Sequence, residues 1–129
     1  MEQSEFTTRT PVEFILPDNL VFEGELRSVF SPRIIERIIA RLPIQSRIHL
    51  WKKEFYFEIG IRMGLEKAVS SCKPGDIAYW PQGDAVCLFF NEMSPFSKVS
   101  PIGQFRLNDY NEVFEQIRSG TPITMRQKA

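Results

Sequence analysis

The sequence is poor in the residues from which metal centres and nucleophilic active sites are built. Its 129 residues include two cysteines, Cys72 and Cys87, and a single histidine, His49. Three such side chains are too few for a four-ligand zinc site, so we expect no bound metal. The chain also has no glycine-rich phosphate loop and no nucleophile elbow. These absences exclude the enzyme classes that are recognised by such short motifs. We also expect no cofactor.

An excess of charge of one sign and long apolar runs are missing as well. Sixteen basic side chains balance sixteen acidic ones, so the protein lacks the positive field of a dedicated nucleic-acid binder. No stretch approaches the roughly 18 apolar residues of a membrane helix, and the polar N-terminus has no signal-peptide core. We therefore expect a cytoplasmic protein with reduced cysteines and with neither a membrane nor a nucleic-acid partner.

The composition is that of one ordinary globular domain. Hydrophobic residues make up 43% of the chain and charged residues 25%, which are close to globular averages, and the length allows a single core. We expect a domain over residues 11–126, with flexible tails at 1–10 and 127–129. Nothing in the sequence points to an oligomeric state.

Short β-favouring runs separated by turn residues dominate the chain. They predict eight strands, at residues 12–16, 20–27, 47–51, 54–59, 76–80, 85–90, 102–107 and 122–125. Ser31 and Pro32 predict a helix start and Pro43 its end, and Asp109 resembles the cap of a second, short helix ending at Gly120. Residues 60–75 are rich in Gly, Ser and Pro and predict a long loop. With no βαβ alternation, this pattern favours a mainly β fold, a closed eight-stranded barrel with two capping helices.

One segment resembles a known family. Residues 75–90, GDIAYWPQGDAVCLFF, are similar to the signature of the cyclophilin-like family of small prokaryotic proteins, and a weaker similarity extends over residues 12–126. The resemblance implies a cyclophilin-like barrel of eight strands with two capping helices, in agreement with the strand count.

The resemblance also bears on activity. True cyclophilins isomerise peptidyl-prolyl bonds with an arginine and a glutamine beside a hydrophobic proline pocket. An ungapped comparison places His49 near the position of that arginine and Phe57 near that of the glutamine, whereas a shift of one or two residues favours Arg47 instead. The tryptophan and histidine of the proline pocket have no counterpart here. The resemblance therefore implies the barrel, with little or no isomerase activity.

Two groups of residues are candidates for a ligand site. Arg47, His49 and Trp51 alternate along one predicted strand and so project from one face. Beside a barrel cleft, this face would bind an acidic or carbonyl-bearing ligand; otherwise it is a solvated outer face. His49 is either an acid–base group or a structural one.

The second group surrounds the hairpin of residues 76–90 and the loop that follows it. Its members are aromatic residues and a methionine, which form adaptable pockets: Trp80, Phe89, Phe90, Met93 and Phe96. About half of the hairpin must face inward, so the loop residues Met93 and Phe96 are the stronger candidates. The sequence thus predicts a module that binds a peptide or small molecule in the barrel cleft. The alternatives are a divergent peptidyl-prolyl isomerase and a small-molecule enzyme that uses the same cleft.

Overall fold

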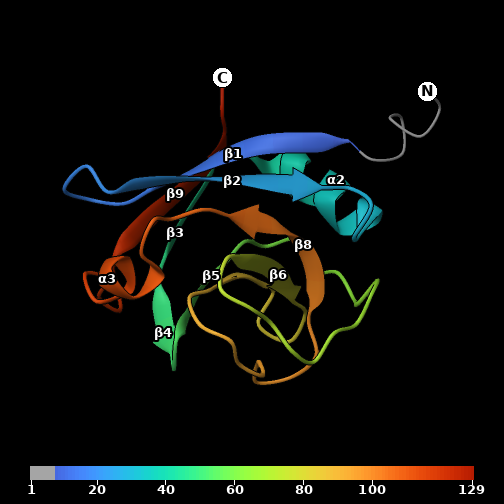
Figure 1. The fold of residues 1–129 in the computed structure, drawn as a ribbon. Coiled ribbons are helices and arrows are strands. Elements are labelled where there is room, and N and C mark those ends of the chain that lie inside the picture. The colour runs from blue at the N-terminus through green and yellow to red at the C-terminus, as the bar shows by residue number, and fades with distance from the viewer. Residues whose placement is uncertain (1–7) are drawn as a thin grey trace.

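Residues 8–129 form one antiparallel sheet of nine strands with two helices. The computed structural model describes residues 8–129. Its strands are β1 (Arg9–Ile15), β2 (Val21–Arg27), β3 (Ile44–Arg47), β4 (His49–Trp51), β5 (Glu54–Glu58), β6 (Asp76–Trp80), β7 (Ala85–Phe89), β8 (Ser100–Phe105) and β9 (Pro122–Gln127). They lie in the order β3-β9-β1-β2-β8-β6-β7-β5-β4, and the sheet curls into a nearly closed barrel (Figure 1). The predicted mainly β barrel with two helices is confirmed, with nine strands in place of the predicted eight.

The additional strand arises because the predicted strand at residues 47–51 is divided at Ile48. On one side of Ile48, β3 pairs with β9, and on the other side β4 pairs with β5. Ile48 itself is fully buried, and its N–H donates to the Thr121 carbonyl at 2.8 Å while its carbonyl accepts from the Gly120 N–H at 2.7 Å. The two edge strands of the sheet are thus consecutive in the chain, which brings the edges together.

Both predicted hairpins are confirmed. The turn between β1 and β2 places Asp18 and Asn19 at φ values of 63° and 61°, a left-handed conformation that Asp and Asn tolerate better than most residues. β1 begins at Arg9, before the predicted Val12, so part of the expected tail at 1–10 belongs to the sheet; its residues 1–7 lie outside the described residues. At the other end, β9 extends to Gln127.

The two helices close the core from different sides (Figure 1). Helix α2 (Pro32–Arg41) buries Ile34, Ile35 and Ile38, as the isoleucine spacing predicts. Helix α3 (Tyr110–Phe114) is capped by Asp109, whose carboxylate accepts from the Glu112 N–H at 3.0 Å. α3 is shorter than predicted: it ends at Phe114, whereas the sequence predicted an end at Gly120. In the described part of the chain, neither helix is long and apolar enough to span a bilayer.

Strand β7 is buried on both faces, which explains why its sequence is apolar throughout. Val86 and Leu88 point into the barrel, whereas Cys87 and Phe89 pack outside it. On the outside, the loops of residues 61–75 and 91–99 cover β5, β6 and β7. Backbone hydrogen bonds join the two loops to each other, at Val69 with Val99 and at Cys72 with Met93. We call the buried residues beneath them the outer cluster: Cys72, Ala78, Cys87, Phe89 and Val99. Both cysteines are free thiols.

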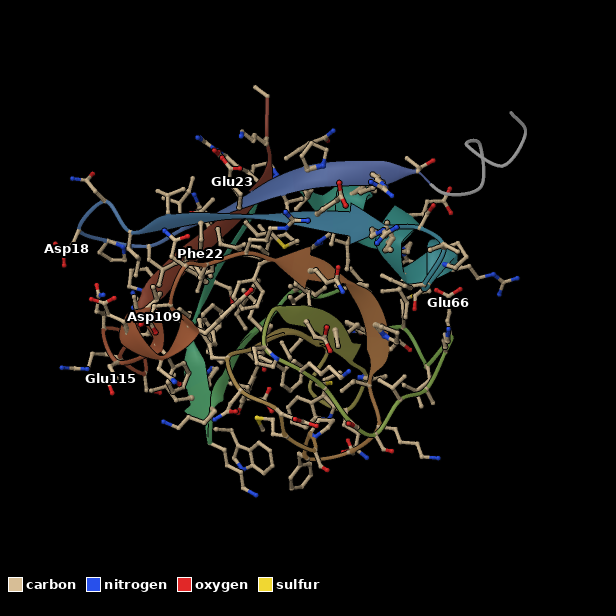
Figure 2. The ribbon with its side chains drawn as sticks, viewed as in Figure 1. Asp18, Phe22, Glu23, Glu66, Asp109 and Glu115 are labelled. Carbon is tan, nitrogen blue, oxygen red and sulfur yellow. The ribbon has the colours of Figure 1, made fainter. Side chains whose placement is uncertain are left out.

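The first turn of α2 is capped from a distant loop. The Ser31 hydroxyl donates to the Pro101 carbonyl at 2.8 Å, so it does not cap the helix. Instead the Glu66 carboxylate, which lies beside α2 in Figure 2, accepts from the Arg33 N–H at 3.1 Å and the Ile34 N–H at 2.6 Å. This carboxylate satisfies two N–H groups that a helix leaves unpaired and anchors the 61–75 loop.

We expect Glu66→Ala to lower the free energy of unfolding by about 1 kcal/mol, because it removes this cap. Lys67→Ala, at an exposed position next to it, is the matched control and is expected to change stability by less than about 0.5 kcal/mol. Urea denaturation of both variants measures the difference, and equal stabilities would show that the cap contributes nothing.

Candidate ligand pocket on the outer face of the barrel

A small, mostly apolar pocket lies on the outer face of the barrel, beside the outer cluster. Its volume is about 190 Å³. It is lined by Trp51 of β4, Glu54 and Tyr56 of β5, Trp80 of β6, Cys87 of β7, and Pro95, Phe96 and Val99 around the 91–99 loop. We call it the outer pocket. The sequence predicts a site in the barrel cleft, whereas the outer pocket lies on the outside of the wall; apolar side chains fill the barrel interior.

The strand pleat and register bring these side chains together. Alternate residues of a strand face opposite sides of the sheet, so Phe55 and Phe57 enter the main core while Glu54 and Tyr56 face outward. The register sets Trp51 opposite Glu54, and Tyr56 opposite Cys87. Four neighbouring strands therefore supply the floor, and the loop supplies the remaining wall.

The aromatic rings of the outer pocket contact one another edge to face. The ring centroids of Trp51 and Phe96 are 5.9 Å apart at an interplanar angle of 87°, and those of Trp80 and Phe96 are 5.9 Å apart at 70°. Tyr56 meets Trp80 at 5.3 Å and 79°. Trp80 also donates from Nε1 to the Ser97 hydroxyl at 2.8 Å, which fixes the indole against the loop. Phe96 remains 67% exposed, so the pocket opens to the surface beside it.

Glu54 is the one carboxylic acid of the outer pocket and is only 4% exposed. Burial raises its pKa to about 7, against a smaller opposing effect of its hydrogen bond with Cys87. Burial also raises the pKa of Cys72 to about 12, with Asp76 and Glu54 adding to the rise, and it raises the pKa of Cys87 well above the usual range. Both thiols therefore stay protonated at neutral pH, where Glu54 titrates.

Three of the predicted site residues meet in the outer pocket: Trp51, Trp80 and Phe96. Met93 is partly buried and packs against the outer cluster beside it. Arg47 and His49 lie outside, in an adjoining open depression. The Arg47 guanidinium donates to the Gly120 carbonyl at 2.8 Å.

Phe90 lies in a different part of the molecule from these residues. Its ring is 1% exposed and belongs to the main core, so the structure gives it a packing role in place of the predicted ligand contact. Glu54 and Tyr56 line the outer pocket but were not among the residues predicted from the sequence. The alternation of Glu54, Tyr56 and Glu58 with two phenylalanines could have predicted them, because alternate residues of a strand lie on one face.

His49 touches the outer pocket only indirectly, by stacking on Tyr56 at a centroid distance of 5.3 Å. Within residues 8–129, no three His, Cys, Asp or Glu side chains come together as metal ligands. The outer pocket is therefore a site of aromatic surfaces with one buried acid.

The comparisons with known proteins concern the whole barrel. A hypothetical protein, AF2241 from Archaeoglobus fulgidus, has a similar solution structure, with a TM-score of 0.77 and 24% identity over 95% of this chain and 97% of that one. The structure of McbB in complex with tryptophan is similar with a TM-score of 0.78 and 12% identity over 92% of this chain. This chain covers 45% of McbB. At these identities the similarity shows the fold.

No curated protein matches the sequence significantly. The family model described as Cyclophilin-like matches residues 10–126, nearly the whole of the nine-stranded barrel. The chain therefore belongs to the cyclophilin-like family.

Proposed function

We propose that this domain is a binding module that holds an apolar group of a small ligand or peptide in the outer pocket. The observation that carries the proposal is a set of aromatic rings lining an opening at the surface, with Phe96 largely exposed. An apolar cavity of about 150 Å³ accommodates benzene, so a volume of about 190 Å³ suits one ring or a group of similar size. McbB, which shares this fold over part of its length, has been solved in complex with tryptophan, a small ligand with an aromatic ring.

The isomerase alternative has less support from the side chains. Arg47 lies outside the outer pocket and already donates to the Gly120 carbonyl. Phe57, aligned with the glutamine of true cyclophilins, is fully buried in the main core. An isomerase rate enhancement on proline peptides that disappears in Arg47→Ala would favour the alternative. A small-molecule enzyme would use the same outer pocket, with Glu54 as its acid or base.

Intrinsic fluorescence provides a direct test, because Trp51 and Trp80 are the only two tryptophans of the chain and both line the outer pocket. We expect the neutral single-ring probes benzyl alcohol and benzamide to change this fluorescence saturably. Amide shifts in an NMR titration should map to β4, β5 and the 91–99 loop.

Two glycines supply a matched pair of variants. A Cβ at Gly83 would lie 2.4 Å from Cε3 and Cζ3 of Trp80, so Gly83→Ala must displace the indole. A Cβ at Gly64 meets nothing within 4 Å. We expect probe binding to weaken several-fold in Gly83→Ala and to stay unchanged in Gly64→Ala. Absence of binding to the wild type, or equal binding to both variants, would contradict the proposal.

A further inference from the structure

The outer pocket combines two features that neutral ligands do not require together. The faces and edges of Trp51, Tyr56, Trp80 and Phe96 surround it, and a carboxylic acid lies among them. Aromatic faces carry negative electrostatic potential and attract cations, most strongly when the cation leaves bulk water. The ring of Trp51 already has such a contact, with the Lys52 ammonium 4.7 Å from its centroid.

Glu54 lacks a cationic partner of its own. Among the described residues, the structure gives it no salt bridge, and its hydrogen-bond partner is the Cys87 thiol. Burial of an unpaired carboxylate is unfavourable, so the free pocket favours the protonated acid. A ligand that brings a positive charge would compensate the ionised form.

The other ionisable groups around Glu54 do not supply that charge. Cys87 on β7 and Cys72 in the 61–75 loop are neutral thiols at neutral pH, and Asp76 at the start of β6 is a second carboxylic acid. Tyr56 on the same strand presents its ring, with His49 of β4 stacked on it. Lys52 lies over Trp51, and Lys53 lies over Phe114, with its Nζ 5.7 Å from that ring centroid.

We propose that the ligand of the outer pocket is an organic cation, a protonated amine or a quaternary ammonium group, held against the aromatic rings and paired with the Glu54 carboxylate. This inference rests on the proposed function, since it names the class of ligand for the same pocket. The proposed ligand differs in charge from the one expected from Arg47 in the sequence. That expected ligand was acidic or carbonyl-bearing. A tetraalkylammonium head group is of the size that the pocket admits.

Charge and shape are separated by a pair of isosteric probes. Choline carries a quaternary ammonium group, and 3,3-dimethylbutan-1-ol has the same shape without the charge. We expect choline to bind the wild type at least tenfold more tightly than the alcohol, as measured by tryptophan fluorescence and NMR titration at pH 8. Equal affinities for the two probes would overturn the inference.

Glu54→Gln removes the charge of the acid with almost no change of shape. We expect it to weaken choline binding about tenfold or more and to leave binding of the neutral alcohol unchanged. Glu58→Gln is the matched control, because Glu58 is exposed on the same face of β5 but does not line the outer pocket. Equal loss of choline affinity in both variants would contradict a specific role for Glu54.

The wild type supplies a second measurement that does not depend on a variant. The cation favours ionised Glu54, so binding should release a proton near neutral pH. Choline affinity should rise up to tenfold per unit as the pH increases towards 7 and level off above it. Affinity for the alcohol should not rise with pH. A choline affinity independent of pH between 5.5 and 8.5 would overturn the pairing.

The outcomes also separate this inference from the proposed function. If benzyl alcohol or benzamide binds and choline does not, the outer pocket is a binding site but the cationic class is wrong. If neither the neutral probes nor choline binds, both the proposed function and the cationic ligand class are wrong.

Discussion

Phe90→Ala is expected to lower the free energy of unfolding by about 3–5 kcal/mol, because it removes a large, fully buried ring from the main core. The ring is 1% exposed and packs against Phe55, Phe105 and Phe114 at centroid distances of 5.5, 5.1 and 5.0 Å. Its removal leaves a cavity where the barrel wall meets α3, which a rigid core fills only in part. Urea denaturation at constant pH measures the loss.

Phe96→Ala is the matched control, because the same residue type lies only six positions away. Phe96 is 67% exposed, so its loss is expected to change stability by less than about 0.5 kcal/mol. It lines the outer pocket, and its removal should weaken binding of benzyl alcohol. If Phe90→Ala has the stability of the wild type and loses ligand binding, Phe90 belongs to the site and the assignment of its packing role is wrong.

Glu54→Gln is expected to stabilise the protein increasingly as the pH rises. The pKa of Glu54 is about 7 in the folded protein and about 4.5 in an exposed carboxyl. Between these values the folded state keeps a proton that the unfolded state releases, so the free energy of unfolding falls as the pH rises. The total loss is about 3 kcal/mol, complete above the folded pKa. Glutamine resembles the protonated acid and does not titrate.

The measurement is the difference in free energy of unfolding between Glu54→Gln and the wild type, at intervals from pH 4.5 to 8.5. Other ionisable groups titrate alike in both proteins, so their effects cancel in the difference. We expect this difference to grow by about 3 kcal/mol across the range. Parallel pH profiles would mean that Glu54 is more hydrated than its burial indicates. Glu58→Gln, at an exposed position on the same strand, should show no such growth.

Local sequence patterns determined most of the secondary structure. The isoleucine spacing, with Pro32 and Pro43 at its ends, was sufficient for α2, and the turn residues were sufficient for both hairpins. These features depend on the backbone preferences of residues close together in the chain. The apolar strands of the second hairpin also indicated its burial, although not that two different clusters bury its two faces.

Such local patterns could not predict that residues 47–51 are divided between two strands. Arg47 and His49 are two residues apart and read as one strand, yet they belong to strands with different partners, β9 and β5. What divides them is the pairing of Ile48 with Gly120 and Thr121, more than 70 positions away. No local signal marks such a contact, so Arg47 and Trp51 were expected in one site and lie in different ones.

The sequence by itself therefore determined a mainly β barrel of the cyclophilin-like family with an aromatic candidate site, because periodicity, turns and the motif of residues 75–90 are local. Only the tertiary structure decided which aromatic residues form that site. Trp51, Trp80 and Phe96 meet because loop 91–99 folds over the outside of the barrel, while Phe90 turns inward. Glu54 lines the same pocket and is buried there, and burial raises the pKa of an acid that reads in sequence as an ordinary surface residue.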